Sequence, residues 1–411
     1  MQNNNHFQKM DVGLMTLINK RSVLELLRST GKMSRSEISK LSGLTPPTVN
    51  RIVKDLISFN LARYSGQAVS NGGRPSVVVE YKSSENLIIG IDLGATYIRG
   101  CLVDLEARFL SEIQIPTEIG NGLENIIEKL IETINKLSVR ARPNQKIWGV
   151  GIGVAGLINY ETGVVENSPD FDWKNVNLRE LIKSRMNFPF FFDNSTRLMA
   201  KGEKELGRYK KESNFAVINV GYGIATGLVV NDSLLHGNKG FTGEIGHIQI
   251  QPNSKIKCEC GKYGCLEALA SGRRIAQMGK ERLSLENIHE IKGLAGLKKE
   301  TITSKIVFKA ALAGDRKAQQ ICEEISDYLA LGIGIISNLL NPSKIFIGGG
   351  VSLSGDYLFG LIKERKDKYL IGQNNDLEIL PTTHGEFATA VGSVSLVLEK
   401  IIELDNILES C

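Results

Sequence analysis

The stretch Gly243-Glu-Ile-Gly-His247, followed by Cys258-Glu-Cys260-Gly-Lys-Tyr-Gly-Cys265-Leu-Glu267, is the most informative part of the chain. Soft thiolates together with one imidazole are the ligands that structural zinc prefers in a closed tetrahedral site. Gly261 and Gly264 would allow the tight turns that aim two of the cysteines at one point. We therefore predict one structural Zn²⁺ per chain, with a disulfide or unrelated free thiols as the alternatives. The predicted ligands are His247, Cys258, Cys260 and Cys265.

The wider pattern, Gly-Glu-x-Gly-His followed by Cys-x-Cys-Gly-x-x-Gly-Cys-x-Glu, resembles the ROK family, which contains sugar kinases and sugar-responsive transcription factors. The resemblance implies a two-lobed α/β body with the actin-like (ribonuclease-H-like) fold of sugar kinases. Glu244, His247 and Glu267 match the positions that contact sugar in that family. The metal and the sugar would then share one rigid platform.

Composition sets broad limits on the protein. A chain of 411 residues predicts two or three domains, and 42% apolar with 23% charged residues is ordinary for soluble globular proteins. There is no run of 18 apolar residues that would predict a membrane span, and the N-terminus, Met-Gln-Asn-Asn-Asn-His, lacks an apolar signal core. We therefore expect the protein to be cytoplasmic. The cytoplasm is a reducing environment, in which disulfides are disfavoured.

Positive charge is concentrated at the N-terminal end. Residues 1–82 carry 12 Lys and Arg against 5 Asp and Glu, a balance of +7, whereas the remaining residues carry 38 against 40, a balance of −2. A small basic module on a nearly neutral body favours a polyanion as the partner of that module. The alternative is a basic face that is merely solvated.

Residues 1–83 have the pattern of a helix-turn-helix. A first helix is expected from about Leu14 to Ser29, and Ser34 with Glu37 forms a capping box for a second, short helix. Gly43 predicts the turn, and Thr45 is a suitable N-cap for a third helix with Pro46 at its first position. The apolar face of that third helix would comprise Val49, Ile52, Val53, Leu56 and Ile57.

The other face of the third helix is polar and basic, as in a recognition helix that enters the major groove. We predict that its DNA contacts are Thr45, Thr48, Asn50, Arg51 and Lys54. Strands at Leu61–Tyr64 and Ser76–Tyr81 would form a wing, whose loop contains Arg74 for a narrow minor groove. This winged module resembles the operator-binding module of ROK repressors. A helical interaction module without a nucleic-acid partner is the alternative.

The remaining chain predicts two α/β lobes, at residues 86–200 and 201–411. A buried strand at Leu87–Thr96 contains Asp92, Gly94 and Thr96, which fit a first phosphate hairpin, or else a tight β-turn that uses Asp and Gly for backbone reasons. Strand, glycine hairpin and strand recur from Phe215, about 130 residues later, as a weak internal repeat. The last helix, from about Glu386 to Glu403, could return to the first lobe.

Three departures from the kinase pattern favour a regulator. ROK kinases hold their general base in a segment Asn-Asp-x-Asn, and the matching segment here, Asp193 to Arg197, places Ser195 at the base position. Losing a general base typically costs about 10²–10⁴ in rate. Asp170 stands where the family has a sugar-binding Asn, and Tyr222 replaces the usual Thr of the second phosphate hairpin.

We therefore predict a carbohydrate-responsive repressor that does not turn over ATP, acting as a homodimer or a dimer of dimers on double-stranded operator DNA. The predicted effector is a sugar or polyol, and its predicted contacts are Asp170, Asn194, Glu244, His247 and Glu267. One alternative is an active ROK sugar kinase with an appended DNA-binding domain, in which a register shifted by two would make Asp193 the base. Another is a body without a ligand that binds DNA constitutively.

Overall fold

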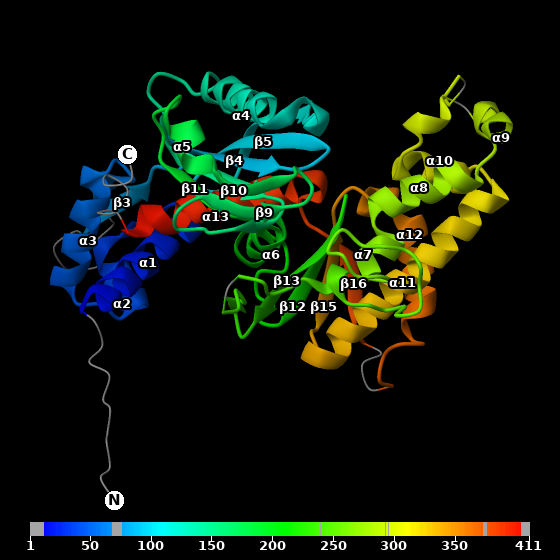
Figure 1. Ribbon diagram of the computed structural model, residues 1–411. Coiled ribbons are helices and arrows are strands. Elements are labelled where there is room, and N and C mark those ends of the chain that lie inside the picture. The colour runs from blue at the N-terminus through cyan, green and yellow to red at the C-terminus, as the bar shows by residue number, and fades with distance from the viewer. Residues whose placement is uncertain are drawn as a thin grey trace, which may run out of the picture.

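The computed structural model describes residues 12–67, 76–238, 240–291, 293–294, 296–372 and 376–403. A small N-terminal module lies beside a first α/β lobe, and a second lobe lies on the far side of that first lobe (Figure 1). None of the helices in these ranges is long and apolar enough to cross a bilayer.

The N-terminal module has three helices and a three-stranded sheet. Its helices are α1 (Val12–Thr30), α2 (Arg35–Ser42) and α3 (Pro46–Ser58). The predicted capping box is confirmed, because Ser34 and Glu37 exchange side-chain and backbone hydrogen bonds at the start of α2, and Gly43 ends that helix at φ 70°. Thr45 is the N-cap of α3 with Pro46 at its first position, as predicted, but its hydroxyl pairs with the Thr48 hydroxyl at 2.9 Å and makes no side-chain bond to the helix backbone.

The wing contains one more strand than the sequence predicts. Strand β1 (Lys32–Ser34) pairs with β3 (Val77–Tyr81), which also pairs with β2 (Ala62–Gln67). Three residues before α2 are too short a pattern to predict a strand, and they become one only because β3 supplies hydrogen-bonding partners. The wing residue Arg74 lies outside the described residues.

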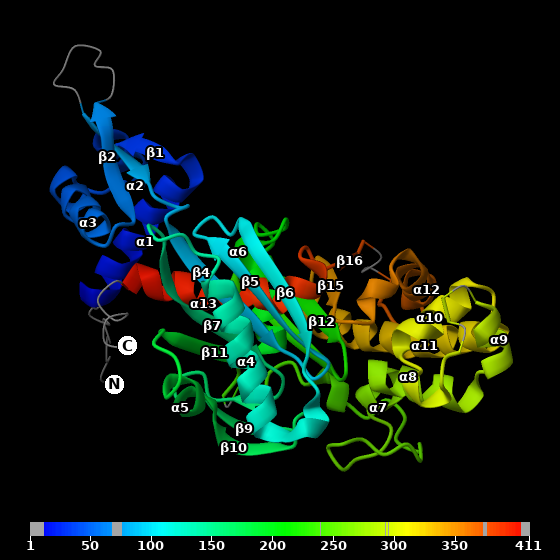
Figure 2. The ribbon, with the colours of Figure 1, turned by 90° about the horizontal axis from the view of Figure 1, so that it is seen from above.

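The first lobe is built on a five-stranded sheet of order β11-β7-β4-β5-β6. Strands β11, β7 and β4 are parallel, whereas β5 and β6 continue as an antiparallel meander. One face is covered by α4 and the opposite face by the last helix (Figures 1 and 2). The elements are β4 (Asn86–Leu93), β5 (Tyr97–Asp104), β6 (Phe109–Pro116), α4 (Gly122–Ser138), β7 (Lys146–Val154) and β11 (Phe190–Asn194), with a small sheet of β8 (Leu157–Ile158), β9 (Val164–Ser168) and β10 (Trp173–Asn177) leading to α5 (Leu178–Lys183).

The second lobe repeats this sheet, with the order β14-β13-β12-β15-β16. Again three parallel strands adjoin an antiparallel meander, which confirms the predicted internal repeat. Its strands are β12 (Phe215–Val220), β13 (Ile224–Val230), β14 (Ser233–Leu234), β15 (Lys344–Gly348) and β16 (Glu378–Pro381). Its helices are α7 (Leu266–Ala270), α8 (Gly272–Arg282), α9 (Leu285–Glu290), α10 (Ser304–Leu312), α11 (Arg316–Leu340) and α12 (Asp356–Lys366).

Two crossing helices join the lobes and the module. Helix α6 (Ser195–Leu206) packs against α13 (Ala388–Glu403), which lies under the first-lobe sheet and runs on to α1. The two helices approach so closely that a Cβ on Gly392 would lie 1.8 Å from the Leu198 carbonyl oxygen. Apolar residues of α1, α3 and α13 belong to one buried cluster, so the module and the body share a core. Because α6 spans position 200, the boundary expected there falls within a helix.

Candidate functional site

The outer face of α3 carries the predicted DNA contacts. Thr45, Arg51 and Lys54 are exposed, whereas Thr48 and Asn50 are half-buried. Arg35 of α2 donates a hydrogen bond from Nη1 to Asn50 Oδ1 at 2.9 Å, which leaves the Asn50 amide nitrogen as the group available to a base edge. The buried opposite face fixes the helix against the module core.

The predicted zinc ligands converge. One ligand atom each from His247, Cys258 and Cys260 lies within 4.8 Å of the other two. His247 Nδ1 is 3.5 Å from Cys258 Sγ, and Cys260 Sγ is 3.8 Å from Cys265 Sγ. Cys265 is thus beside the group of three without belonging to it. Burial raises the pKa of the Cys258 thiol to about 12, so a cation would be needed to hold that sulfur as a thiolate at neutral pH.

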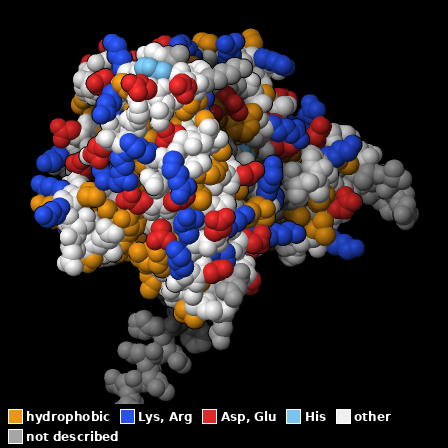
Figure 3. All heavy atoms as spheres, turned by 90° about the vertical axis from the view of Figure 1, so that its right-hand side faces the viewer, with side chains coloured by type: hydrophobic (Ala, Val, Ile, Leu, Met, Phe, Trp, Pro, Cys, Tyr) orange, Lys and Arg blue, Asp and Glu red, His pale blue; other side chains and the backbone are white. Residues whose placement is uncertain are grey.

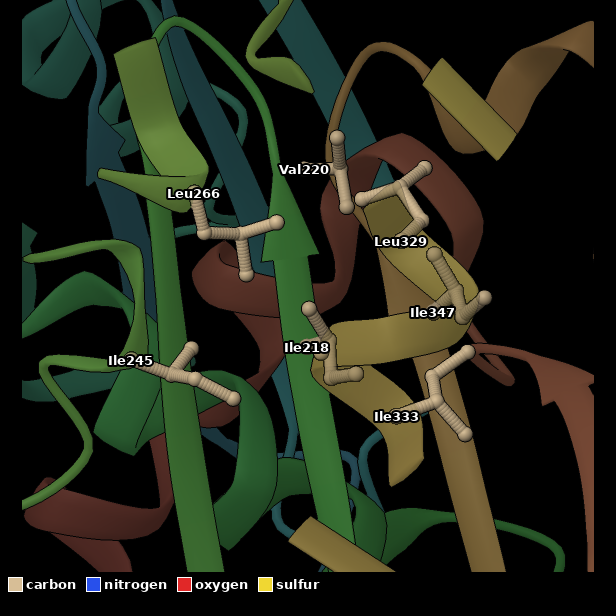
Figure 4. A pocket seen from close by; sticks show the side chains of 8 residues that line it. Ile218, Val220, Ile245, Leu266, Leu329, Ile333 and Ile347 are labelled. Atoms are coloured by element: carbon tan, nitrogen blue, oxygen red, sulfur yellow. The ribbon is translucent and has the colours of Figure 1, made fainter. Parts of the chain in front are cut away.

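Residues 244–267 carry the predicted zinc ligands and are called the metal loop below. Two apolar side chains anchor this loop to the second-lobe core. Ile245 and Leu266 point into a small void between the second-lobe sheet and α11, which Ile218, Ile333 and Ile347 also line (Figure 4). Predicted site residues lie on both sides of each anchor in the sequence. Glu244 and His247 flank Ile245, and Cys265 and Glu267 flank Leu266. Because the labelled lining is apolar, this void is a packing feature that positions the site and does not suit a sugar.

Carboxylates gather beside the metal loop. His247 Nε2 lies 3.9 Å from Glu244 Oε2, so this ring can offer one nitrogen to a metal and the other to a ligand. Glu267 Oε2 accepts a hydrogen bond from the Ile224 amide at 3.0 Å. Burial, and then the charge of Glu267, raises the pKa of Asp170 to about 6. Burial also raises the pKa of Glu244. Convergent carboxylates of this kind suit a ligand with several hydroxyl donors.

Asn194 and Ser195 lie where β11 passes into α6. Asn194 Oδ1 accepts hydrogen bonds from the amides of Thr196 and Arg197, and its Nδ2 donates to the Gly156 carbonyl at 2.8 Å. The side chain therefore caps α6, and a second amide hydrogen is left for a ligand. Ser195 is the first helical residue and is 7% exposed.

Asp193 is committed to an ion pair. Arg197 donates from Nε and Nη2 to Asp193 Oδ1 at 2.8 and 2.5 Å, and both side chains are about 5% exposed. Burial favours the neutral form of Asp193, but nearby His236 and the charge and hydrogen bonds of Arg197 outweigh it, so its pKa is lowered. A low pKa makes Asp193 a poor general base.

The two glycine hairpins differ in their surroundings. Asp92 lies 3.8 Å from Arg99 Nη1, and burial raises its pKa to about 6. At the second hairpin, the Arg273 guanidinium lies over the Tyr222 ring, 5.0 Å from its centroid, and donates to Glu259 at 2.8 Å. On the face in Figure 3, acidic and basic side chains are interspersed, in keeping with the nearly neutral charge of the body.

Sequence reasoning missed Arg197 and Arg273 as residues of the site. Arg197 had a usable signal, because it follows the Asn-Ser-Thr cap at the place where the kinase segment has Asn. Arg273 begins α8 and has no motif; its Nη2 approaches Glu267 Oε1 at 3.9 Å only because the chain folds back after α7.

Comparisons with known proteins agree with this architecture. The ROK family profile matches residues 88–400, and a winged helix-turn-helix DNA-binding profile matches residues 17–58. The chain is 30% identical over 400 residues to the xylose repressor of Caldicellulosiruptor bescii, covering 95% of this chain and 97% of that one. It is 32% identical over 319 residues to the glucokinase of Halalkalibacterium halodurans, covering 77% of this chain and 96% of that one.

A solved structure of a ROK family transcriptional regulator, a homolog of the E. coli MLC protein, superposes with a TM-score of 0.77 at 27% identity. That match covers 96% of this chain and 98% of the other. The winged module and the two-lobed body are both included in such a span. The chain is therefore a member of the ROK family that carries a winged helix-turn-helix module ahead of its sugar-kinase-like body.

Proposed function

We propose that this protein is a carbohydrate-responsive transcriptional regulator, acting as a repressor of the genes whose operators its winged module binds. The observation that carries the proposal is the state of the base position. The Ser195 hydroxyl cannot accept a proton from a sugar hydroxyl at neutral pH, and the neighbouring carboxylate, Asp193, is already bound to Arg197. Occupancy of the cleft then leads to a change of conformation instead of phosphoryl transfer.

Similarity to xylose repressors over almost the whole chain supports this role. On the module, exposed Arg51 and Lys54 suit phosphate or base contacts, and we retain Thr45, Thr48, Asn50 and the wing residue Arg74 as further DNA contacts. If two subunits pair, small rotations of their bodies would change the spacing of the recognition helices against half-sites about 34–36 Å apart. We propose a homodimer, or a dimer of dimers, for that reason.

The proposed effector is a sugar or polyol bound by Asp170, Asn194, Glu244, His247 and Glu267. The carboxylates would accept hydrogen bonds from hydroxyls, and a ligand without those hydroxyls would leave buried acceptors unpaired, which penalises its binding. The resemblance to xylose repressors makes pentoses the first class to test.

We propose that the group His247, Cys258 and Cys260 holds a structural Zn²⁺, with Cys265, whose Sγ lies 3.8 Å from that of Cys260, as the fourth ligand. Thiolates and one imidazole suit a closed tetrahedral site, and the bound ion would stabilise the thiolate form of buried Cys258. Held in this way, the loop would keep His247 and Glu267 in place for the effector.

An active sugar kinase with a DNA-binding module is the second candidate, favoured by the 32% identity to a glucokinase over 77% of this chain. A coupled assay of ADP release with a panel of pentoses, hexoses and polyols separates the two. We expect rates at least about 10²-fold below the roughly 1–100 s⁻¹ of ordinary kinases. Turnover in that ordinary range would refute the regulator without catalysis.

A further inference from the structure

Arg197 lies in the first turn of α6, and its guanidinium touches both lobes. Nε and Nη2 donate to Asp193 Oδ1, at the end of β11 in the first lobe. Nη1 donates to the carbonyl oxygen of Gly240 at 2.6 Å, in the loop after β14 of the second lobe. The rigid planar fork holds both partners in one fixed geometry, whereas the ammonium of a lysine is a single point on a flexible stem.

The loop that receives this hydrogen bond leads directly to Glu244. Gly237, Gly240 and Gly243 all have positive φ, at 72°, 73° and 94°. The Gly243 carbonyl accepts from the Thr226 amide at 2.7 Å, and a Cβ on Gly243 would lie 1.7 Å from the Thr226 carbonyl oxygen. One end of the loop is therefore clamped to β13, while its middle is held by Arg197.

The other oxygen of Asp193 also faces this loop. His236 Nε2 lies 3.8 Å from Asp193 Oδ2, and the His236 ring is 6.1 Å from the ring of Tyr160, which belongs to the first lobe. Three separate contacts thus bring His236 and Gly240 against the first lobe. Both partners of the central ion pair are buried, so the contact is shielded from solvent and salt.

We propose that Arg197 is a positioning residue that latches the two lobes: by holding Gly240 against Asp193, it fixes the loop that presents Glu244 to the effector. Its role in effector binding rests on the proposed function, whereas the latch itself does not. When the lobes separate, the hydrogen bond to Gly240 must break, so the geometry of the effector contacts is tied to the lobe angle. Arg197 would act through the loop without touching the sugar.

The test compares Arg197→Lys with Arg179→Lys in the full-length protein. Lysine keeps the charge near Asp193 but cannot also reach Gly240 with a fork. Arg179 is the matched control, because its guanidinium bonds only first-lobe carbonyls, those of Glu161, Thr162 and Phe190. Hydrogen exchange read by mass spectrometry should rise at least about tenfold in the 237–247 segment for Arg197→Lys and stay unchanged there for Arg179→Lys.

Unchanged exchange in 237–247, or an equal rise throughout the protein, would overturn the latch. Should Arg197→Lys fail to fold, half-exposed His236→Ala decides instead, with a smaller rise confined to the same segment expected. A second arm titrates D-xylose and D-glucose. Arg197→Lys should bind whichever sugar the wild type binds about ten- to a hundredfold more weakly, and unchanged affinity would contradict the positioning role. If the wild type binds neither sugar, the result counts against the proposed effector class. The hydrogen-exchange result alone would then show whether Arg197 latches the lobes.

Discussion

At the residue scale, the buried carboxylates of the candidate site differ in their surroundings and therefore in their pKa. Asp193 is paired with Arg197 and has a lowered pKa, whereas burial, and then the charge of Glu267, raises the pKa of Asp170. Glu267 itself is fixed by the Ile224 amide. A carboxylate already paired with a guanidinium is a poor base, whereas Asp170, with a pKa of about 6, is still mostly ionised at neutral pH and can accept hydrogen bonds from hydroxyls.

Replacing Asp170 with Asn should change how stability depends on pH. Its folded pKa of about 6 lies above the ordinary value of 3.8, so the unfolded chain ionises at Asp170 before the native state does, and stability falls as pH rises through this interval. Asp170→Asn removes that loss, and its melting temperature should exceed that of the wild type by more at pH 7.5 than at pH 4.5. Asp172→Asn is the control, because that side chain is exposed. A difference that does not vary with pH would contradict the environment assigned to Asp170.

Replacing Cys260 with Ser should remove about one zinc per chain and lower the melting temperature, because serine is a poor ligand for this ion. Elemental analysis of the purified protein measures the zinc. Cys322→Ser is the matched control, since Cys322 is buried in the second-lobe core away from the cluster and should leave the metal content unchanged. Full zinc in the Cys260→Ser protein would refute the ligand set.

At the scale of elements, α3 is a helix whose two faces have separate tasks. Arg51→Ala removes an exposed side chain, so it should weaken operator binding by about 1–3 kcal/mol without changing the melting temperature. Fluorescence anisotropy on a duplex selected from a random library measures the affinity, and its salt dependence should also become shallower. Arg140→Ala, on the surface of the first lobe, should do neither. Equal binding by wild type and Arg51→Ala would exclude this contact.

The crossing of α6 and α13 depends on glycine. A methyl group at Gly392 would meet the Leu198 carbonyl oxygen at 1.8 Å, so Gly392→Ala should destabilise the protein by about 1–3 kcal/mol despite the better helix propensity of alanine. Gly360 in α12 has nothing within 4 Å of the same position, and Gly360→Ala should raise stability by up to about 1 kcal/mol. Thermal denaturation compares them, and a Gly392→Ala protein as stable as Gly360→Ala would mean that the helices do not cross so closely.

Long periodic elements were predictable from the sequence, and contacts between distant segments were not. The predicted helix with Pro46 at its first position is α3, the predicted last helix ends at Glu403 as α13 does, and the internal repeat appears as two sheets of matching order. Strand β1 was missed because it depends on a partner far along the chain. Arg273 was missed for the same reason: only tertiary folding brings it to Glu267. The metal ligands were accessible because their types and spacing are local.

At the scale of the whole molecule, the candidate effector site and the winged module share packed elements. Helix α6 starts at that site with Asn194 and Ser195, packs on α13, and α13 contacts α1. Asn86 adds a second connection: its side chain donates to the Asn60 carbonyl of the module and accepts from Trp148 Nε1 of the first lobe at 2.7 Å. A rotation of one lobe would therefore move both the candidate effector site and the winged module.

The most direct test of the proposed function is the affinity of the full-length protein for its selected operator, measured by anisotropy with each sugar or polyol of a broad panel and without ATP. Release of a repressor needs a differential affinity of a few kcal/mol between the two states. We expect at least one compound to change the operator dissociation constant by about tenfold or more, and Glu244→Gln to abolish that response while leaving affinity for free operator intact. An operator affinity indifferent to every compound, in a protein that phosphorylates one of them at ordinary kinase rates, would contradict the account.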